Sequence, residues 1–306
     1  MVTAQRKVSD MARRLVGLVL LAVSAFAAPC TLHHPVAPGD TLAGLAVSYY
    51  GDKDFAPAIL IGTNSRSSEG FPFIKNPFSL PKGDLCIPDA QEAAHSRAQY
   101  AAYQKAVAAT GVAKPSQESR DLVVIQANQP VTEATWTRSD QVTKLRGKRD
   151  SDTWVTVEPH LKEFCSAFAR EHNADQDELT RRLEKRLGLP PAAGDTTFVR
   201  IRIARPDSAR AIFRPCSNPK TAVVSCEAGP PSGEDPEYTA WFTGQYYSAF
   251  GLPRPNLYPW TALGYTFDWA QDDDGEFKRV GESEFVIPKD APIEVLGAVS
   301  TADYCR

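Results

Sequence analysis

The stretch Pro38-Gly39-Asp40-Thr41-Leu42 organises the N-terminal part of the chain. Its glycine permits a sharp turn, and its aspartate and threonine can each cap a helix. Apolar residues then recur at helical spacing, and Gly51 is a favourable C-terminal stop. We therefore expect a short strand, a turn and a helix that ends near Tyr50.

The residues that follow extend this pattern into a compact unit. A second short helix is expected over residues 54–63. After a loop, Pro81-Lys82-Gly83-Asp84 forms a turn into a short strand over residues 85–87, which Pro88 closes. Residues 32–88 thus have the order strand, helix, helix, strand.

This region resembles a LysM domain, a small module that binds N-acetylglucosamine polymers in peptidoglycan or chitin. The matching motifs, in chain order, are Pro38-Gly39-Asp40-Thr41-Leu42, Tyr49-Tyr50-Gly51-Asp52, Asn64, Asn76-Pro77 and the run from Leu80 to Pro88. The long loop from Ser65 to Lys75 departs from the family pattern.

The resemblance implies a shallow sugar-binding groove between two loops. One loop precedes the first helix, and the other precedes the second strand. The positions carried over are Gly39, Asp40, Thr41, Ile74, Asn76 and Pro77. Loops on a rigid scaffold supply the backbone donors and the small apolar platform that N-acetyl groups need. Gly39 and Asp40 also serve the turn and the helix cap.

The N-terminus has the pattern of a secretion signal over residues 1–27. Arg13 and Arg14 precede an apolar run that is too short to span a bilayer, and Ala25-Phe26-Ala27 is a suitable cleavage site. Translation could also begin at Met11. We expect a secreted or periplasmic protein associated with the cell wall, without a membrane span after cleavage.

The length of 306 residues leaves room for two domains. We expect the LysM-like unit over residues 30–89, a helix and linker over 90–120, and a larger domain over 121–306. The net charge of -3 and the absence of a long basic patch argue against a nucleic-acid partner.

All 6 cysteines follow the expected cleavage site, and an even number in an exported chain indicates disulfides. Cys30 and Cys86 bracket the LysM-like unit, whose two strands lie side by side. The expected pairs are Cys30–Cys86, Cys216–Cys226 and Cys165–Cys305. The alternative for Cys165 is a nucleophilic thiolate near His160.

The larger domain has a mixed pattern that predicts an α+β fold. Strand-like runs are expected at residues 122–125, 154–157, 263–269, 283–288 and 293–298, and helices near 161–168, 179–187 and 238–250. Residues 126–152 are polar and basic, which favours a surface loop. Residues 196–204 alternate strictly, so Arg200 and Arg202 face away from Val199, Ile201 and Ile203.

Aromatic residues are dense between residues 238 and 269. Most are expected in the core, and some can line a pocket for a sugar or nucleotide. Together with Phe213-Arg214-Pro215-Cys216, this region resembles a family of exported microbial proteins, a resemblance that implies no particular activity.

The segment Gly281-Glu282-Ser283-Glu284 and the residues after it are similar to the closing motif of ADP-ribosyltransferases. The resemblance implies that Glu284 stabilises the positive charge on the ribose as nicotinamide leaves. Arg200 or Arg202 would hold the phosphates. Tyr265-Thr266 stands where the family has Ser-Thr-Ser. The alternative is that both glutamates are ordinary edge-strand charges.

No metal or cofactor site is predicted. Carboxylates around Gly275, in the run Asp272-Asp273-Asp274-Gly275-Glu276, could hold calcium, but a solvated hairpin tip is the favoured interpretation. The 5 histidines are scattered and have no zinc-binding spacing.

Overall fold

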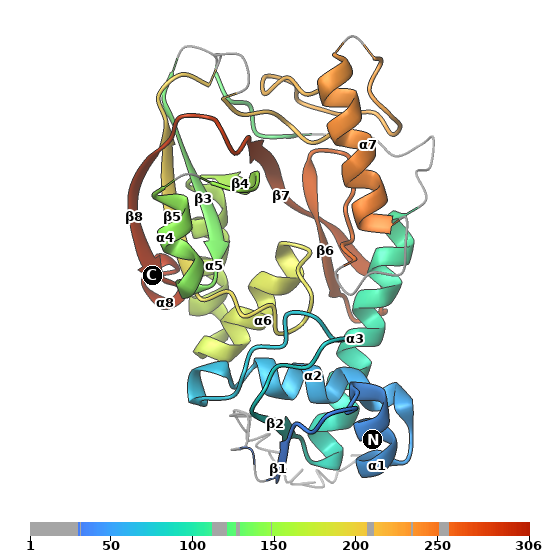
Figure 1. Ribbon diagram of the computed structural model, residues 1–306. Coiled ribbons are helices and arrows are strands. Elements are labelled where there is room, and N and C mark those ends of the chain that lie inside the picture. Colours follow the sequence, from blue (N-terminus) through green and yellow to red (C-terminus); the bar gives the residue numbers. More distant parts are fainter. Residues whose placement is uncertain are drawn as a thin grey trace, which may run out of the picture.

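The computed structural model describes residues 30, 32–111, 121–126, 129–147, 149–206, 211–233, 235–250 and 257–306. It contains a small N-terminal unit and a larger α+β domain, with helix α3 running between them (Figure 1).

The N-terminal unit has the predicted order of strand, helix, helix and strand. Its elements are β1 (Leu32–Pro35), α1 (Leu42–Tyr50), α2 (Ala56–Asn64) and β2 (Asp84–Ile87), with short 3-10 turns at Lys53–Phe55 and Ser67–Glu69. The two strands pair antiparallel, with Leu32 opposite Ile87. The side chain of Thr41 caps α1, and Gly51 ends it in the left-handed conformation.

Helix α3 (Ala90–Thr110) packs against both parts of the chain. Near its start, Glu92 pairs at 2.8 Å with the buried Arg66, which follows α2. Near its end, the Tyr103 hydroxyl donates to the carbonyl of Leu257 at 2.7 Å, and the ring lies edge-on to Trp269. The linker expected after α3 lies almost entirely outside the described residues.

The larger domain is built on a six-stranded antiparallel sheet in the order β6-β7-β4-β3-β5-β8. The strands are β3 (Val131–Thr137), β4 (Thr153–Val157), β5 (Thr197–Ile203), β6 (Tyr265–Gln271), β7 (Phe277–Ile287) and β8 (Glu294–Ser300). The helices are α4 (Val142–Leu145), α5 (His160–His172), α6 (Gln176–Arg186), α7 (Pro236–Phe250) and α8 (Thr301–Tyr304), with a 3-10 turn at Ser139–Gln141.

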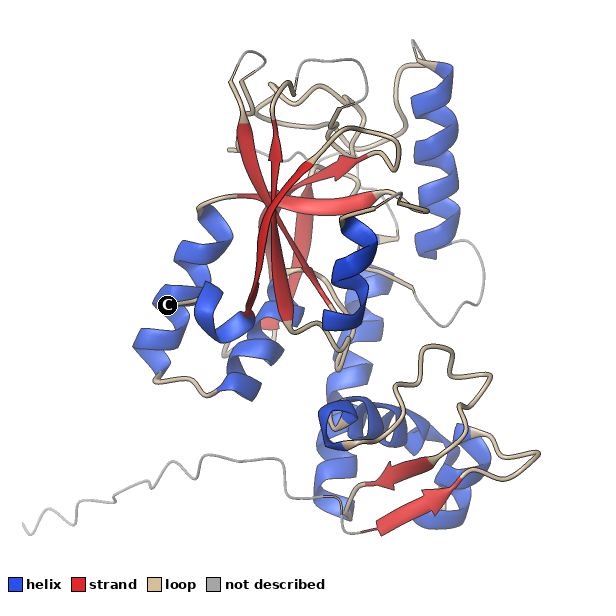
Figure 2. Cartoon of the chain, turned by 60° about the vertical axis from the view of Figure 1, so that its left-hand side comes forward, coloured by secondary structure: helices blue, strands red, loops and turns tan. Residues whose placement is uncertain are grey.

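The two faces of the sheet bury different cores. Helices α5, α6 and α8 lie together against one face, where Leu161 and Leu183 pack on Phe198 (Figure 2). On the other face, Ile201 and Phe285 belong to a core that irregular segments complete. These cores explain why β5, which supplies both faces, alternates so regularly.

The sheet opens between β3 and β4. These strands pair at only two positions, Glu133 with Val157 and Ala134 with Thr156. By contrast, β3 pairs with β5 along its whole length. The C-terminal half of β3 and the N-terminal half of β4 therefore diverge, which creates space within the sheet.

Two sequence predictions about this domain are wrong. The expected surface loop contains β3, a central strand, because the buried Glu133 interrupts its apolar pattern. Burial raises the pKa of Glu133 well above its ordinary value. Residues 122–125 form no strand, because only single hydrogen bonds, such as Leu122 N to Val224 O, hold them.

The loop before β2 also contacts the larger domain. The Arg138 guanidinium lies over the Phe73 ring, 4.2 Å from its centre. Gly194 also lies against this ring, and a side chain there would collide with it. This contact brings Lys75 to the wall of a cavity in the larger domain.

Candidate functional site

The first predicted glycan-binding loop is a rigid turn before α1. Gly39 has a φ of 94°, which favours glycine. Asp40 accepts a hydrogen bond from Ala37 N at 2.7 Å and bonds to His34 Nε2 at 2.9 Å. The His34 bond is the larger cause of the lowered pKa of Asp40, so this carboxylate is an anion at neutral pH. Gly39 and Thr41 are exposed.

The second predicted loop is held by Asn64. Its side chain accepts from Ile74 N at 2.7 Å and donates to Ile74 O at 3.2 Å. The Ile74 side chain lies in the core of the unit, and the predicted ligand contact at this position stays a prediction. Asn76 is exposed and Pro77 is half-buried.

Sequence reasoning missed Phe78 as a candidate contact. This ring is 77% exposed, and the Asn76 side chain accepts from its backbone N–H at 3.0 Å. An exposed ring beside Asn76 and Pro77 provides the apolar platform on which a sugar ring can pack. Its position directly after Asn76-Pro77 was the available signal.

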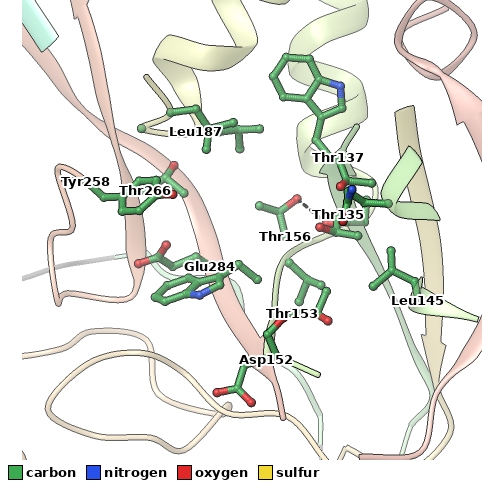
Figure 3. A pocket seen from close by; sticks show the side chains of 18 of the residues that line it. Thr135, Thr137, Leu145, Asp152, Thr153, Thr156, Leu187, Tyr258, Thr266 and Glu284 are labelled. Carbon is green, nitrogen blue, oxygen red and sulfur yellow. Dashed lines mark hydrogen bonds between the residues drawn. The ribbon is translucent and has the colours of Figure 1, made fainter. Parts of the chain in front are cut away.

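A cavity of about 760 Å³ lies where β3 and β4 diverge, within the usual size of small-molecule sites. Its walls combine indole and phenol rings, threonine hydroxyls and charged groups. They include Trp136, Trp154, Tyr258, Trp260, Thr135, Thr137, Thr153, Thr156, Thr266, Lys75, Lys144, Arg149, Asp150, Asp152 and Glu284. In Figure 3, Glu284 and Thr266 lie on one wall, opposite Thr135 and Leu145.

Glu284 is the unusual group of this cavity. It is only 6% exposed, and its Oε1 has no hydrogen-bond partner among the described residues. Burial raises the pKa of Glu284 to about 8, against the opposing effect of the Arg214 charge. Burial thus favours the protonated carboxyl, whereas a ligand that carries positive charge favours its ionisation.

The structure does not bring Arg200 or Arg202 to Glu284. Neither arginine lines the cavity, and both side chains are about half exposed. Arg200 makes a bidentate contact with Glu158, and Arg202 lies 3.9 Å from Glu294. Their predicted role against the phosphates is therefore not supported by their placement.

Arg200 and Glu284 are on the same face of the sheet, but they are too far apart across the strands. Glu284 is opposite Thr156, which is opposite Ala134, which is opposite Arg200. Residues in such a cross-strand row share one face of the sheet. Three strand spacings nevertheless separate Arg200 from Glu284, or roughly 14 Å.

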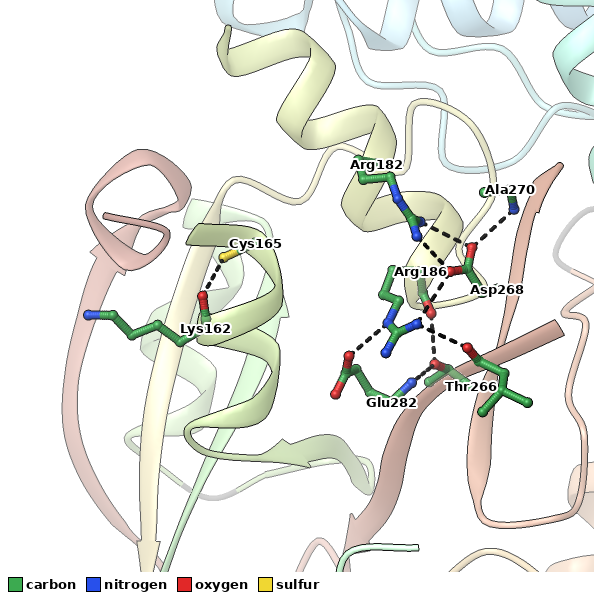
Figure 4. Close-up of polar contacts among 9 residues, drawn as sticks. Lys162, Cys165, Arg182, Arg186, Thr266, Asp268, Ala270 and Glu282 are labelled. Carbon is green, nitrogen blue, oxygen red and sulfur yellow. Dashed lines mark hydrogen bonds and ion pairs between the residues drawn. The ribbon is translucent and has the colours of Figure 1, made fainter. Parts of the chain in front are cut away.

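Glu282, the first glutamate of the motif, has a structural role. Arg186 donates to it through Nε at 2.7 Å, and the same arginine reaches the buried Asp268 at 3.5 Å (Figure 4). Asp268 also accepts two hydrogen bonds from Arg182, at 3.1 and 2.7 Å. This network attaches the β6–β7 hairpin to α6, and of the two glutamates of the motif Glu284 is the one that lines the cavity.

The acidic run at the β6–β7 turn forms a hydrogen-bonded hairpin tip. Asp272 Oδ1 accepts from the backbone N–H groups of Asp274 and Glu276, at 3.1 and 2.9 Å. Across the described ranges, no group of three or more His, Cys, Asp or Glu side chains could hold a metal ion.

The structure contains three disulfides, Cys30–Cys86, Cys165–Cys305 and Cys216–Cys226, which are the expected pairs. Cys165 is bonded, so it is not the nucleophile of the alternative interpretation. Three disulfides indicate a protein of an oxidising compartment. The expected signal segment lies outside the described residues. Among the helices that the structure describes, none is long and apolar enough to cross a membrane.

Comparisons with known proteins identify no related protein. No protein-family model matches the chain, and neither a curated protein nor a solved structure matches it. The functional interpretation therefore rests on the residues and geometry described above.

Proposed function

We propose that this is an exported cell-envelope protein that binds polymers of N-acetylglucosamine, in peptidoglycan or chitin, through its LysM-like N-terminal unit. The unit presents the larger domain at the wall. The observation that supports this function is the pairing of two rigid loops on one small core: the exposed turn at Gly39 and Thr41, and the loop that carries Asn76 and Phe78.

The chemistry of the two loops suits an uncharged acetylated sugar. The turn offers backbone groups around Gly39, and the second loop offers the Asn76 amide beside the exposed Phe78 ring. Both loops are held by internal hydrogen bonds, so little conformational entropy is lost on binding. A shallow surface of this kind buries little ligand, so a single unit binds with modest affinity.

The glycan-binding proposal predicts retention of the full chain on insoluble peptidoglycan or chitin. Asn76→Ala and Phe78→Ala should each weaken retention by about fivefold, because one polar or packing contact contributes about 1 kcal/mol. Val47→Ala, another exposed apolar position in the unit, should have no effect. The measurement is the bound fraction at increasing polymer concentration. Wild-type protein that stays in the supernatant with both polymers would contradict the proposal.

A second candidate function is cleavage of NAD by the larger domain. The observation that favours it is Glu284, a buried carboxyl at the cavity between β3 and β4 whose Oε1 has no hydrogen-bond partner among the described residues. As nicotinamide leaves, positive charge develops on the ribose. That positive charge favours ionisation of Glu284, and the resulting carboxylate stabilises the charge on the ribose in a water-poor site. The nearby Trp154 and Trp260 provide faces for flat rings.

This candidate predicts that the purified full chain releases nicotinamide from NAD. Glu284→Gln should lower the rate about 100-fold or more, because the neutral amide cannot neutralise the developing charge. Glu294→Gln, at an exposed position on β8, is the matched control and should leave the rate unchanged. Free nicotinamide is measured by chromatography. Absence of release, or equal release by the Glu284 variant, removes this candidate.

A further inference from the structure

The cavity contains a cation that ion pairing does not explain. Arg149 is 5% exposed and precedes β4. Its Nε and Nη2 donate to the backbone carbonyls of Pro288, Lys289 and Ala291, at 2.6–3.1 Å. The charges of Asp152 and Asp290 act on Arg149, but neither carboxylate forms a salt bridge with it, and its Nη1 has no hydrogen-bond partner among the described residues. A buried charge without a close counter-ion is costly, and an anionic ligand offsets that cost.

Arg149 lies on the side of the cavity where a cationic wall forms. Lys144, on α4, lines the same cavity and is exposed. Arg149 also lines an adjoining cavity of about 670 Å³. Figure 3 shows Leu145, the neighbour of Lys144, across the cavity from Glu284. The cavity thus has a carboxyl wall and a cationic wall.

The acidic side chains of the cavity do not cancel this wall. Asp152 accepts from Trp241 Nε1 at 2.9 Å and from Lys289 N at 3.0 Å, so both of its oxygens are engaged. Asp150 and Asp290, which lines the adjoining cavity beside Arg149, are exposed, where water screens their charges. The Arg149 guanidinium is held by three carbonyls, so it is ordered before a ligand arrives.

We propose that Arg149 and Lys144 bind the pyrophosphate of a nucleotide whose ribose end reaches Glu284. The inference rests on the second candidate function and names cations other than Arg200 and Arg202. A guanidinium that still has a free donor forms short, charge-assisted hydrogen bonds to phosphate oxygens, and a lysine adds a mobile charge at the mouth.

The test measures binding of ADP-ribose, inorganic pyrophosphate and adenosine to the full chain by calorimetry. Lys144→Glu and Arg149→Lys should each raise the Kd for ADP-ribose at least tenfold and leave that for adenosine unchanged. Lys144 is exposed, so its variant keeps the fold. Arg149→Lys keeps the charge but loses the planar fork. Lys278→Glu, an exposed change on β7 outside both cavities, should bind like wild type.

The outcomes separate this inference from the activity. The proposed role of Arg149 and Lys144 is wrong if the wild-type protein binds neither ADP-ribose nor pyrophosphate. It is also wrong if the variants weaken binding of adenosine as much as binding of ADP-ribose. If Lys144→Glu weakens ADP-ribose binding but the wild-type protein releases no nicotinamide from NAD, the pyrophosphate-binding role is supported and NAD cleavage is rejected. Unchanged ADP-ribose affinity in both variants also overturns the inference.

Discussion

Removal of the Cys165–Cys305 disulfide by the double change to alanine should lower the free energy of unfolding by about 4–5 kcal/mol. The bond joins residues separated by 140 positions, from α5 to the C-terminal end. A cross-link that closes such a long loop removes much of the entropy of the unfolded chain. Alanine is the better replacement, because serine would bury a hydroxyl at two positions that are almost fully buried.

The matched control is the Cys216–Cys226 bond, whose residues are separated by only 10 positions. Its removal should cost less, about 2–3 kcal/mol, because the closed loop is short. Urea unfolding of both double variants measures the difference. Equal losses for the two pairs would show that loop closure does not set the stability of this domain.

Asp268→Asn should lower the free energy of unfolding by about 3–5 kcal/mol. Asp268 is fully buried and accepts from Arg182 at 2.7 and 3.1 Å, and from the backbone N–H of Ala270 at 3.0 Å. Without the carboxylate, Arg182 is left in a mostly buried position without its counter-charge. The change also loosens the β6–β7 hairpin, which carries Glu284 into the cavity.

The exposed Asp303–Arg306 pair provides the control for this prediction. Asp303→Asn should cost less than about 1 kcal/mol, because water screens both charges. The double change of Asp268 to Leu and Arg182 to Met should be milder than Asp268→Asn, because it removes both charges of the tightest pair. Thermal and urea unfolding report these values. A small loss for Asp268→Asn would show that Arg186 and Arg182 find other partners.

The N-terminal unit could be predicted from the sequence because its signals are local. The Thr41 cap and the Gly51 stop each act within one helical turn, and each occurs as expected. The capping box of Asp175 and Glu178 at α6 is equally local. In β5, alternation alone placed Arg200 and Arg202 on one face.

The candidate sites required the tertiary structure. Glu284 could be selected from its motif, but its burial follows from the pairing of β7 with β4, which lies far away in the chain. Arg149 appeared to belong to a surface loop, and only packing against residues 288–291 makes it a buried cation. The exposure of Phe78 likewise followed only from the structure, although its position directly after Asn76-Pro77 was a local signal.

The sequence by itself determined which segments become helices and strands wherever capping, turns or alternation act over a few residues. The three cysteine pairs expected from export pattern and position also occur in the structure, although the number of cysteines alone allows other connectivities. Only the tertiary structure decided where the sheet opens, because β3 and β4 diverge after two pairs. That opening depends on strand contacts across long stretches of sequence, and no local pattern records which charges will face it.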